Sequence, residues 1–184
     1  MTAPENFWIR RRVRTGYPVA FAFLLLAKPS RISLLVGVAV GIVGLAMRAW
    51  AAGFLRKHEA LATDGPYALT LNPLYFGSAI LAMGVIVAGN SVWGVSMVVI
   101  YILFFYPAVM RREEAELRER YGQQFETYAA LVPLFWPRMR ISAPNLAETA
   151  KFSSRLYSQN REYQAAIGFL LGIAVLWAKM RWMK

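Results

Sequence analysis

The sequence predicts an all-α integral membrane protein, a helical bundle of about five transmembrane helices that includes a helical hairpin. Three observations support this prediction. Hydrophobic residues make up 58% of the 184 residues and charged residues only 17%, whereas soluble domains average about 45–50% and about 25%. The apolar residues gather in long runs. Lys and Arg, 21 against 10 Asp and Glu, flank those runs, which indicates contact with membrane lipids rather than with nucleic acid.

Two apolar segments come first. Residues 15–27 carry no charge but would be only about 20 Å long as a helix, so their flanking cations must reach the membrane interface if the segment spans. The next segment, Ile32–Leu55, is interrupted only by Arg48, which must extend to the interface or turn into the bundle. Small residues at four-residue spacing allow close helix contact, and the relevant glycines of this segment are Gly37, Gly41 and Gly44.

The hairpin is predicted by a run without charges. No charged residue occurs between Asp64 and Arg111, a distance of 46 residues. A single helix of that length would be about 69 Å long, more than twice the hydrocarbon core, so the run must fold back. The turn residues Gly89-Asn90-Ser91 place the turn, which leaves arms at residues 74–88 and 92–110.

A last apolar segment, residues 164–178, is followed by Trp and basic residues typical of a membrane interface. With five spans, 15 Lys and Arg lie on the side that carries the N-terminus and the polar stretches 56–73 and 111–162, against five on the other side. The positive-inside bias therefore predicts that both polar stretches face the cytoplasm. We expect a single multi-pass membrane domain over residues 1–184.

The two polar stretches flank the hairpin and must supply any site for a soluble cofactor. The chain has no Cys and one His, which excludes disulfides and Cys nucleophiles and leads us to expect no metal site. Asn72-Pro73 predicts a helix start with a side-chain cap and a Pro at the first position, and such a start favours an anion. Carboxylates at Glu113 and Glu114, just outside a span, could hold an ammonium group.

Five short motifs resemble, in their order and spacing, the isoprenylcysteine carboxyl methyltransferase and phospholipid methyltransferase superfamily. The motifs are Gly65-Pro66-Tyr67, Asn72-Pro73-Leu74-Tyr75-Phe76-Gly77, Glu113-Glu114 with Leu117, Tyr121-Gly122, and Tyr128 before Val132-Pro133. The resemblance covers residues 56–138, and it leaves 139–184 as a cytoplasmic connector and C-terminal transmembrane helix. It implies a methyltransferase that takes S-adenosylmethionine, releases S-adenosylhomocysteine, and acts on a lipid or lipophilic small-molecule acceptor. It also implies a cofactor pocket on the cytoplasmic side of the hairpin.

The resemblance implies a set of cofactor-binding residues within these motifs, to which we add the nearby histidine. The expected cofactor-binding residues are His58, Gly65, Tyr67, Asn72, Pro73, Tyr75, Gly77, Glu113 and Glu114. Glu114 is also the expected catalytic residue, because a carboxylate can deprotonate an acceptor hydroxyl or amine. Several of them have a simpler interpretation. His58 can be solvated, the tyrosines can lie at the membrane interface, Asn72 can be a helix cap, and Glu113 and Glu114 can begin a surface helix in which Glu114 pairs with Arg118.

One position departs from the family pattern. The family commonly has Arg before the His-Pro or Asn-Pro pair, and here Leu71 stands in that place. Arg56, Lys57 or Arg111 are possible substitutes for the missing cation. Two other functions therefore stay open: an NADPH-dependent membrane reductase of related architecture, and a non-catalytic membrane scaffold protein.

Overall fold

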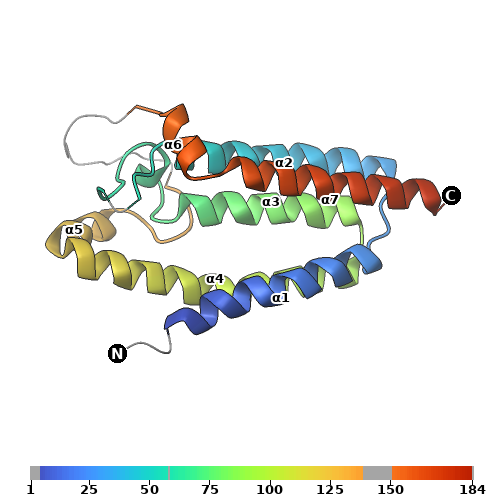
Figure 1. The fold of residues 1–184 in the computed structure, drawn as a ribbon, viewed down its shortest axis with the longest axis horizontal. Coiled ribbons are helices and arrows are strands. Elements are labelled where there is room, and N and C mark those ends of the chain that lie inside the picture. The colour runs from blue at the N-terminus through green and yellow to red at the C-terminus, as the bar shows by residue number, and fades with distance from the viewer. Residues whose placement is uncertain (1–4, 58, 139–150, 184) are drawn as a thin grey trace.

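The computed structural model describes residues 5–57, 59–138 and 151–183, and every regular element in these ranges is helical. Five long helices lie along the long axis of the molecule (Figure 1). The elements, in chain order, are α1 (Glu5–Leu26), α2 (Arg31–Ala52), the 3-10 helix η1 (Gly65–Ala68), α3 (Pro73–Gly89), α4 (Val92–Tyr121), α5 (Gln123–Leu131), α6 (Ser154–Gln159) and α7 (Tyr163–Trp182).

Three of these helices, α2, α4 and α7, are long and apolar enough to cross a membrane. Two more apolar stretches are shorter, Arg14–Leu26 within α1 and Pro73–Gly89 in α3. The part of the chain that the structure describes is therefore an all-helical membrane bundle, and the number of five spans stays a prediction. The α4 helix also continues past the predicted span end at residue 110 to Tyr121, because the residues that follow are mostly strong helix formers such as Arg, Glu, Ala and Leu.

The predicted turn of the hairpin is confirmed. Asn90 ends α3 in the left-handed conformation, with φ 47° and ψ 50°, which Asn tolerates better than other residues with a side chain. The Ser91 hydroxyl then accepts a hydrogen bond from the Gly94 N–H at 3.3 Å and caps α4. This turn is bonded to the turn between α1 and α2, since the Lys28 N–H donates to the Gly89 carbonyl at 2.7 Å.

The α2 glycines allow close helix contact, as their spacing predicts: Gly37 and Gly44 face α3, and Gly41 faces Phe169 of α7. A Cβ added at Gly37 would lie 2.5 Å from the Gly84 carbonyl oxygen, and one added at Gly84 would lie 2.5 Å from the Gly41 nitrogen. The two backbones are thus in direct contact, which is how membrane helices gain packing where no hydrophobic driving force acts between them. The α2–α3 pair is the most extensively packed helix pair among the described residues.

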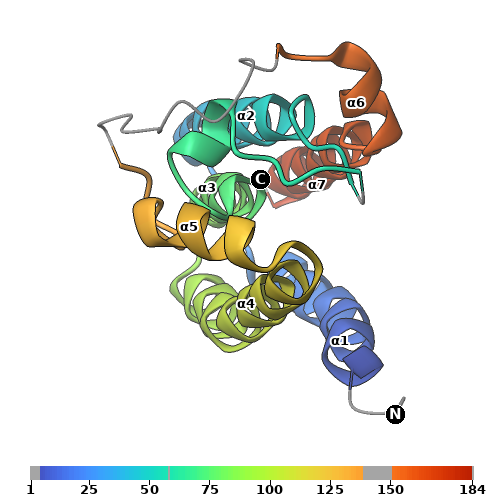
Figure 2. The ribbon, with the colours of Figure 1, turned by 90° about the vertical axis from the view of Figure 1, so that its left-hand side faces the viewer.

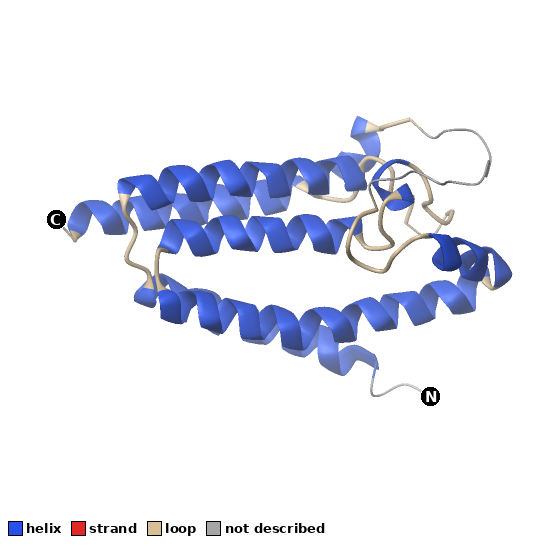
Figure 3. Ribbon diagram, turned by 180° about the vertical axis from the view of Figure 1, so that it is seen from behind, coloured by secondary structure: helices blue, strands red, loops and turns tan. Residues whose placement is uncertain are grey.

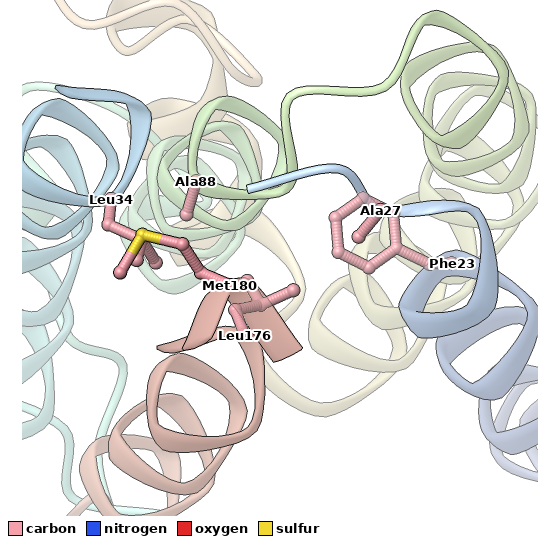
Figure 4. Close-up of a cluster of buried hydrophobic side chains, with 6 residues drawn as sticks. All are labelled: Phe23, Ala27, Leu34, Ala88, Leu176 and Met180. Carbon is pink, nitrogen blue, oxygen red and sulfur yellow. The ribbon is translucent and has the colours of Figure 1, made fainter. Parts of the chain in front are cut away.

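A buried apolar cluster closes the end of the bundle that carries these two turns (Figure 4). Its members come from α1, α2, α3 and α7 and the residue after α1, and they are Phe23, Ala27, Leu34, Ala88, Leu176 and Met180. Next to it, the Lys179 ammonium donates to the Leu24 and Leu25 carbonyls, both at 2.7 Å. These carbonyls end α1 without intrahelical partners, so α7 is attached to α1 at this end.

At the opposite end, α3 and α4 diverge from their shared turn (Figures 1 and 3). The loops that connect α2 to α3 gather there, and α5 lies across this end (Figure 2). The polar stretches 56–73 and 111–138 therefore meet at one end of the bundle, as the sequence predicts.

Candidate functional site

A cavity of about 700 Å³ lies at the end of the bundle where α3 and α4 diverge. Its walls come from the last turns of α2, the loop that follows α2, Tyr67 of η1, the start of α3, α4 from Tyr101 onward, and α5. This volume lies within the range of small-molecule and cofactor sites, about 300–1,000 Å³. The cavity is the place where the two polar stretches meet.

The part of η1 that lines the cavity is the buried Tyr67. Gly65 begins η1 with φ 59°, a backbone conformation that side chains strain. Tyr67 is 7% exposed, and its carbonyl accepts the Tyr128 hydroxyl of α5 at 2.6 Å. Burial raises the pKa of Tyr67 well above its ordinary value, and the nearby Tyr128 and Glu113 add to the rise. Burial likewise raises the pKa of Tyr128, so both phenols are neutral at ordinary pH.

Residues 70–72, just before α3, are hydrogen-bonded to residues 133–135, which follow α5. The Leu71 N–H donates to the Pro133 carbonyl at 2.9 Å, and the Thr70 hydroxyl donates to the Phe135 carbonyl at 3.0 Å. Asn72 occupies the N-cap position, as predicted, but its side chain makes no capping hydrogen bond. Its amide instead donates to the Leu134 carbonyl at 3.0 Å, so the prediction of a side-chain cap is wrong. The Asn72 amide belongs to the attachment of α5 to this loop.

The α4 wall faces α3 across the cavity. The Tyr75 hydroxyl donates to Glu113 Oε1 at 2.7 Å, and the Tyr75 ring stands edge-on to the Tyr106 ring with centroids 5.3 Å apart. Glu114 Oε1 accepts from Arg118 at 3.0 Å, which confirms the pair expected one helical turn apart. Glu113 and Glu114 thus both lie on the cavity wall, each with a hydrogen-bond donor from this region.

Six of the nine predicted cofactor-binding residues line this cavity. They are Tyr67, Asn72, Pro73, Tyr75, Glu113 and Glu114. Gly65 and Gly77 are not among the lining residues, and His58 lies outside the described residues. A Cβ added at Gly77 would lie 2.8 Å from Arg48 Cγ. The absence of a side chain at Gly77 of α3 therefore allows the Arg48 side chain of α2 to pack against α3.

Two of the three cations named as substitutes for the missing Arg line the cavity. Leu71 lines the cavity together with Arg56 and Lys57, whereas Arg111 is not a lining residue. The cavity is also lined by residues that were not predicted as site residues, among them Arg48, Tyr101, Tyr106, Arg120 and Phe125. Phe125 could have been expected, because it lies three residues before Tyr128 of the last motif and neighbours at that spacing share a helix face.

Arg48 turns into the bundle rather than toward the interface. Its Nε and Nη2 donate to the two carboxylate oxygens of Glu162, each at 2.9 Å, in a bidentate pair. Its Nη1 donates to the Ser78 hydroxyl and, at 3.5 Å, to the Leu74 carbonyl. The exposed fractions of the two charged side chains are 20% and 11%. The sequence analysis assigned no role to Glu162. One feature of the sequence could have indicated the pair: Glu162 is the last acidic residue before the C-terminal apolar segment, and Arg48 is the only charged residue within its own apolar segment.

These observations define a class of protein: an integral membrane bundle with a cavity lined by groups of both charges at one end. Residues 33–124 match the phospholipid methyltransferase family. The chain belongs to this family, as the motifs around the hairpin predict. No solved structure gave a significant match.

Two curated relatives are similar to this chain. One is the cobalt-zinc-cadmium resistance protein CzcN of Cupriavidus metallidurans, 30% identical over 65% of this chain and 55% of that protein. The other is the nickel-cobalt-cadmium resistance protein NccN of Alcaligenes xylosoxydans xylosoxydans, 32% identical over 55% of this chain and 50% of that protein. The chain thus spans about half the length of these relatives. Among the described residues, no group of three or more His, Asp or Glu side chains is placed to hold a metal ion.

Proposed function

We propose that this protein is a methyltransferase that uses S-adenosylmethionine and transfers its methyl group to a lipophilic or membrane-embedded acceptor. The observation that supports this most strongly is the cavity itself: six residues predicted from the family motifs, on two stretches of chain, line one space. The family match over residues 33–124 supports the same activity.

The residues present fit the cofactor. Its amino-acid end carries an ammonium and a carboxylate, and the cavity offers the carboxylates of Glu113 and Glu114 and the cations of Arg56 and Lys57. Charge-assisted hydrogen bonds of this kind are the strong ones. Its adenine ring needs a flat apolar neighbour, and the cavity supplies aromatic side chains for stacking. The aromatic lining residues are Tyr67, Tyr75, Tyr101, Tyr106, Tyr121, Phe125 and Tyr128.

The cofactor supplies a methyl group on a positively charged sulfur, so the protein has to align donor and acceptor and exclude water. The Tyr75–Glu113 hydrogen bond joins α3 to α4 and fixes both side chains on the cavity wall. Glu114 lies beside them and is the group we assign to accept a proton from an acceptor hydroxyl or amine. The buried Tyr67 and Tyr128 stay neutral and serve as hydrogen-bonding wall residues.

The acceptor and the topology are part of the same proposal. Residues of α2 and α4 line the cavity, and both helices are long and apolar enough to cross a membrane, which supports lateral access for an acceptor that dissolves in the bilayer. We propose five spans, with α1 and α3 crossing beside α2, α4 and α7, and with the cavity on the cytoplasmic side. The charge asymmetry along the chain favours this orientation.

Calorimetry of the purified full-length chain with S-adenosylhomocysteine and, separately, with NADPH tests the proposal. Binding of the first supports the methyltransferase, binding of NADPH alone would favour the reductase, and binding of neither would favour the scaffold protein.

The role of the α4 carboxylates needs two variants and a control. In Glu113→Gln and Glu114→Gln, at least one variant should bind S-adenosylhomocysteine more weakly by about 1.5–3 kcal/mol, the range for a hydrogen bond to a charged group. Glu119→Gln is the matched control, because Glu119 lies on the same helix but does not line the cavity. Unchanged affinity in both variants and in the double variant would refute the assignment.

A further inference from the structure

The Arg48 side chain connects three helices. It projects from α2, donates to the Ser78 hydroxyl and the Leu74 carbonyl of α3, and pairs with Glu162 at the start of α7. The Ser78 hydroxyl in turn donates to the Leu74 carbonyl at 2.7 Å. Every nitrogen of the guanidinium therefore has a described partner, and the fork geometry of Arg permits all of these bonds at once.

The α3 part of this network is also cavity wall. Leu74 and Ser78 line the cavity, as does Arg48 itself. Leu74 and Tyr75 belong to the first turn of α3, so the bond from Arg48 to the Leu74 carbonyl acts on the turn that carries Tyr75. Gly77 allows this contact, because a side chain there would collide with Arg48 Cγ.

Glu162 is the attachment of the C-terminal segment to this end of the bundle. It is the N-cap residue of α7. Just before it, the Asn160 amide donates to the Ala52 carbonyl at 3.0 Å and to the Leu55 carbonyl at 2.9 Å. These carbonyls lead into the 55–62 loop, which forms another part of the cavity wall. The start of α7 thus holds both the end of α2 and, through Arg48, the start of α3.

We propose that Arg48 is a positioning residue: paired with Glu162, it holds the first turn of α3 in place and so sets the cavity wall that carries Asn72, Pro73 and Tyr75. The inference rests on the proposed function, because its importance is for cofactor binding in that cavity. It assigns a role in that binding to α7, which lies outside the part of the chain that matches the family. A charged group that is largely removed from water is destabilising unless an opposite charge pairs with it. Loss of the Glu162 carboxylate would therefore leave the Arg48 guanidinium without the partner that orients it.

The test compares two variants that each release one end of α7. Glu162→Gln removes the charge partner of Arg48 at the cavity end, and Lys179→Met removes the bonds to α1 at the other end. Because the chain has no Cys, Leu74→Cys introduces a single thiol on the first turn of α3. Its rate of reaction with a water-soluble maleimide reports the packing of that turn without any cofactor.

We expect Glu162→Gln to raise the labelling rate of Leu74→Cys severalfold and to weaken S-adenosylhomocysteine binding about tenfold, since displaced wall residues misalign several contacts at once. Lys179→Met should lower the thermal midpoint but leave both readouts unchanged. Ser78→Ala, which keeps the ion pair but removes one Arg48 acceptor, should act in the same direction as Glu162→Gln and provides the test if that variant does not fold.

The proposal is overturned if the labelling rate in Glu162→Gln, or in Ser78→Ala where the first variant is unfolded, equals that in Lys179→Met. Absence of S-adenosylhomocysteine binding to the unsubstituted chain would instead count against the proposed function, and the labelling rates would still decide the role of Arg48.

Discussion

The close packing of α2 on α3 makes a quantitative prediction for Gly84→Ala. The added Cβ would lie 2.5 Å from the Gly41 nitrogen and 2.7 Å from both the Gly37 oxygen and the Gly41 Cα. Ordinary contacts between carbon atoms are about 3.5–4.0 Å, so the helices would have to separate by about 1 Å. The atoms in the way are backbone atoms of a helix, which cannot swing aside as the end of a side chain can.

The magnitude follows from two opposing terms. Overpacking of this kind costs about 1–3 kcal/mol, whereas Ala is favoured over Gly inside a helix by about 0.5–1 kcal/mol. Gly172→Ala is the matched control, because a Cβ at Gly172 of α7 meets no atom within 4 Å. The Gly172→Ala variant therefore gains the helix propensity of Ala without any packing cost. The difference between the two variants therefore isolates the packing cost, about 1–3 kcal/mol.

Reversible unfolding in mixed micelles, followed by circular dichroism with increasing denaturing detergent, measures both variants on one scale. We expect Gly84→Ala to unfold first and Gly172→Ala to be at least as stable as the unsubstituted chain. Equal stability of the two variants would show that α2 and α3 are not in backbone contact, and the reasoning about the glycine face would be refuted.

Three further predictions concern the cavity, the topology and pH. Leu71→Arg places a cation on the cavity wall and should strengthen S-adenosylhomocysteine binding in calorimetry; equal affinity in equally stable proteins would mean that no cation is needed there. Reporter fusions within residues 56–73 should report the cytoplasm and a fusion at Asn90 should not, whereas a cytoplasmic signal at Asn90 would exclude the membrane-crossing hairpin. Burial raises the pKa values of Tyr67 and Tyr128 in the folded protein. The two neutral phenols therefore contribute their full stabilisation below the pKa of about 10 that Tyr has in the unfolded chain. This stabilisation is lost as the pH rises above that value, because the unfolded chain then releases protons that the folded protein retains. Tyrosinate absorbance should show both ionising only together with unfolding, and their ionisation near pH 10 in the folded protein would contradict their burial.

Local sequence features determined much of this protein. The long apolar runs, the helix-stopping Gly89-Asn90-Ser91 and the small-residue face of α2 each act within a few residues, and the structure confirms the turn and the face. The same holds for the Glu114–Arg118 pair, since neighbours four residues apart on a helix must meet. The family motifs likewise directed attention to the two stretches that meet at the cavity, because motif order and spacing can be read along the chain.

Other features depend on segments that are distant in the sequence. Arg48 pairs with Glu162 across 114 positions, and periodicity along one helix cannot show which distant charge returns to it. Asn72 illustrates the same limit: its sequence context predicts a local cap, but the Leu134 carbonyl becomes available only once α5 has packed. Gly77 belongs to a family motif, yet its neighbour in space is the Arg48 side chain. A buried polar group takes whichever partner the packed helices bring within reach, and only the tertiary structure decides which one that is.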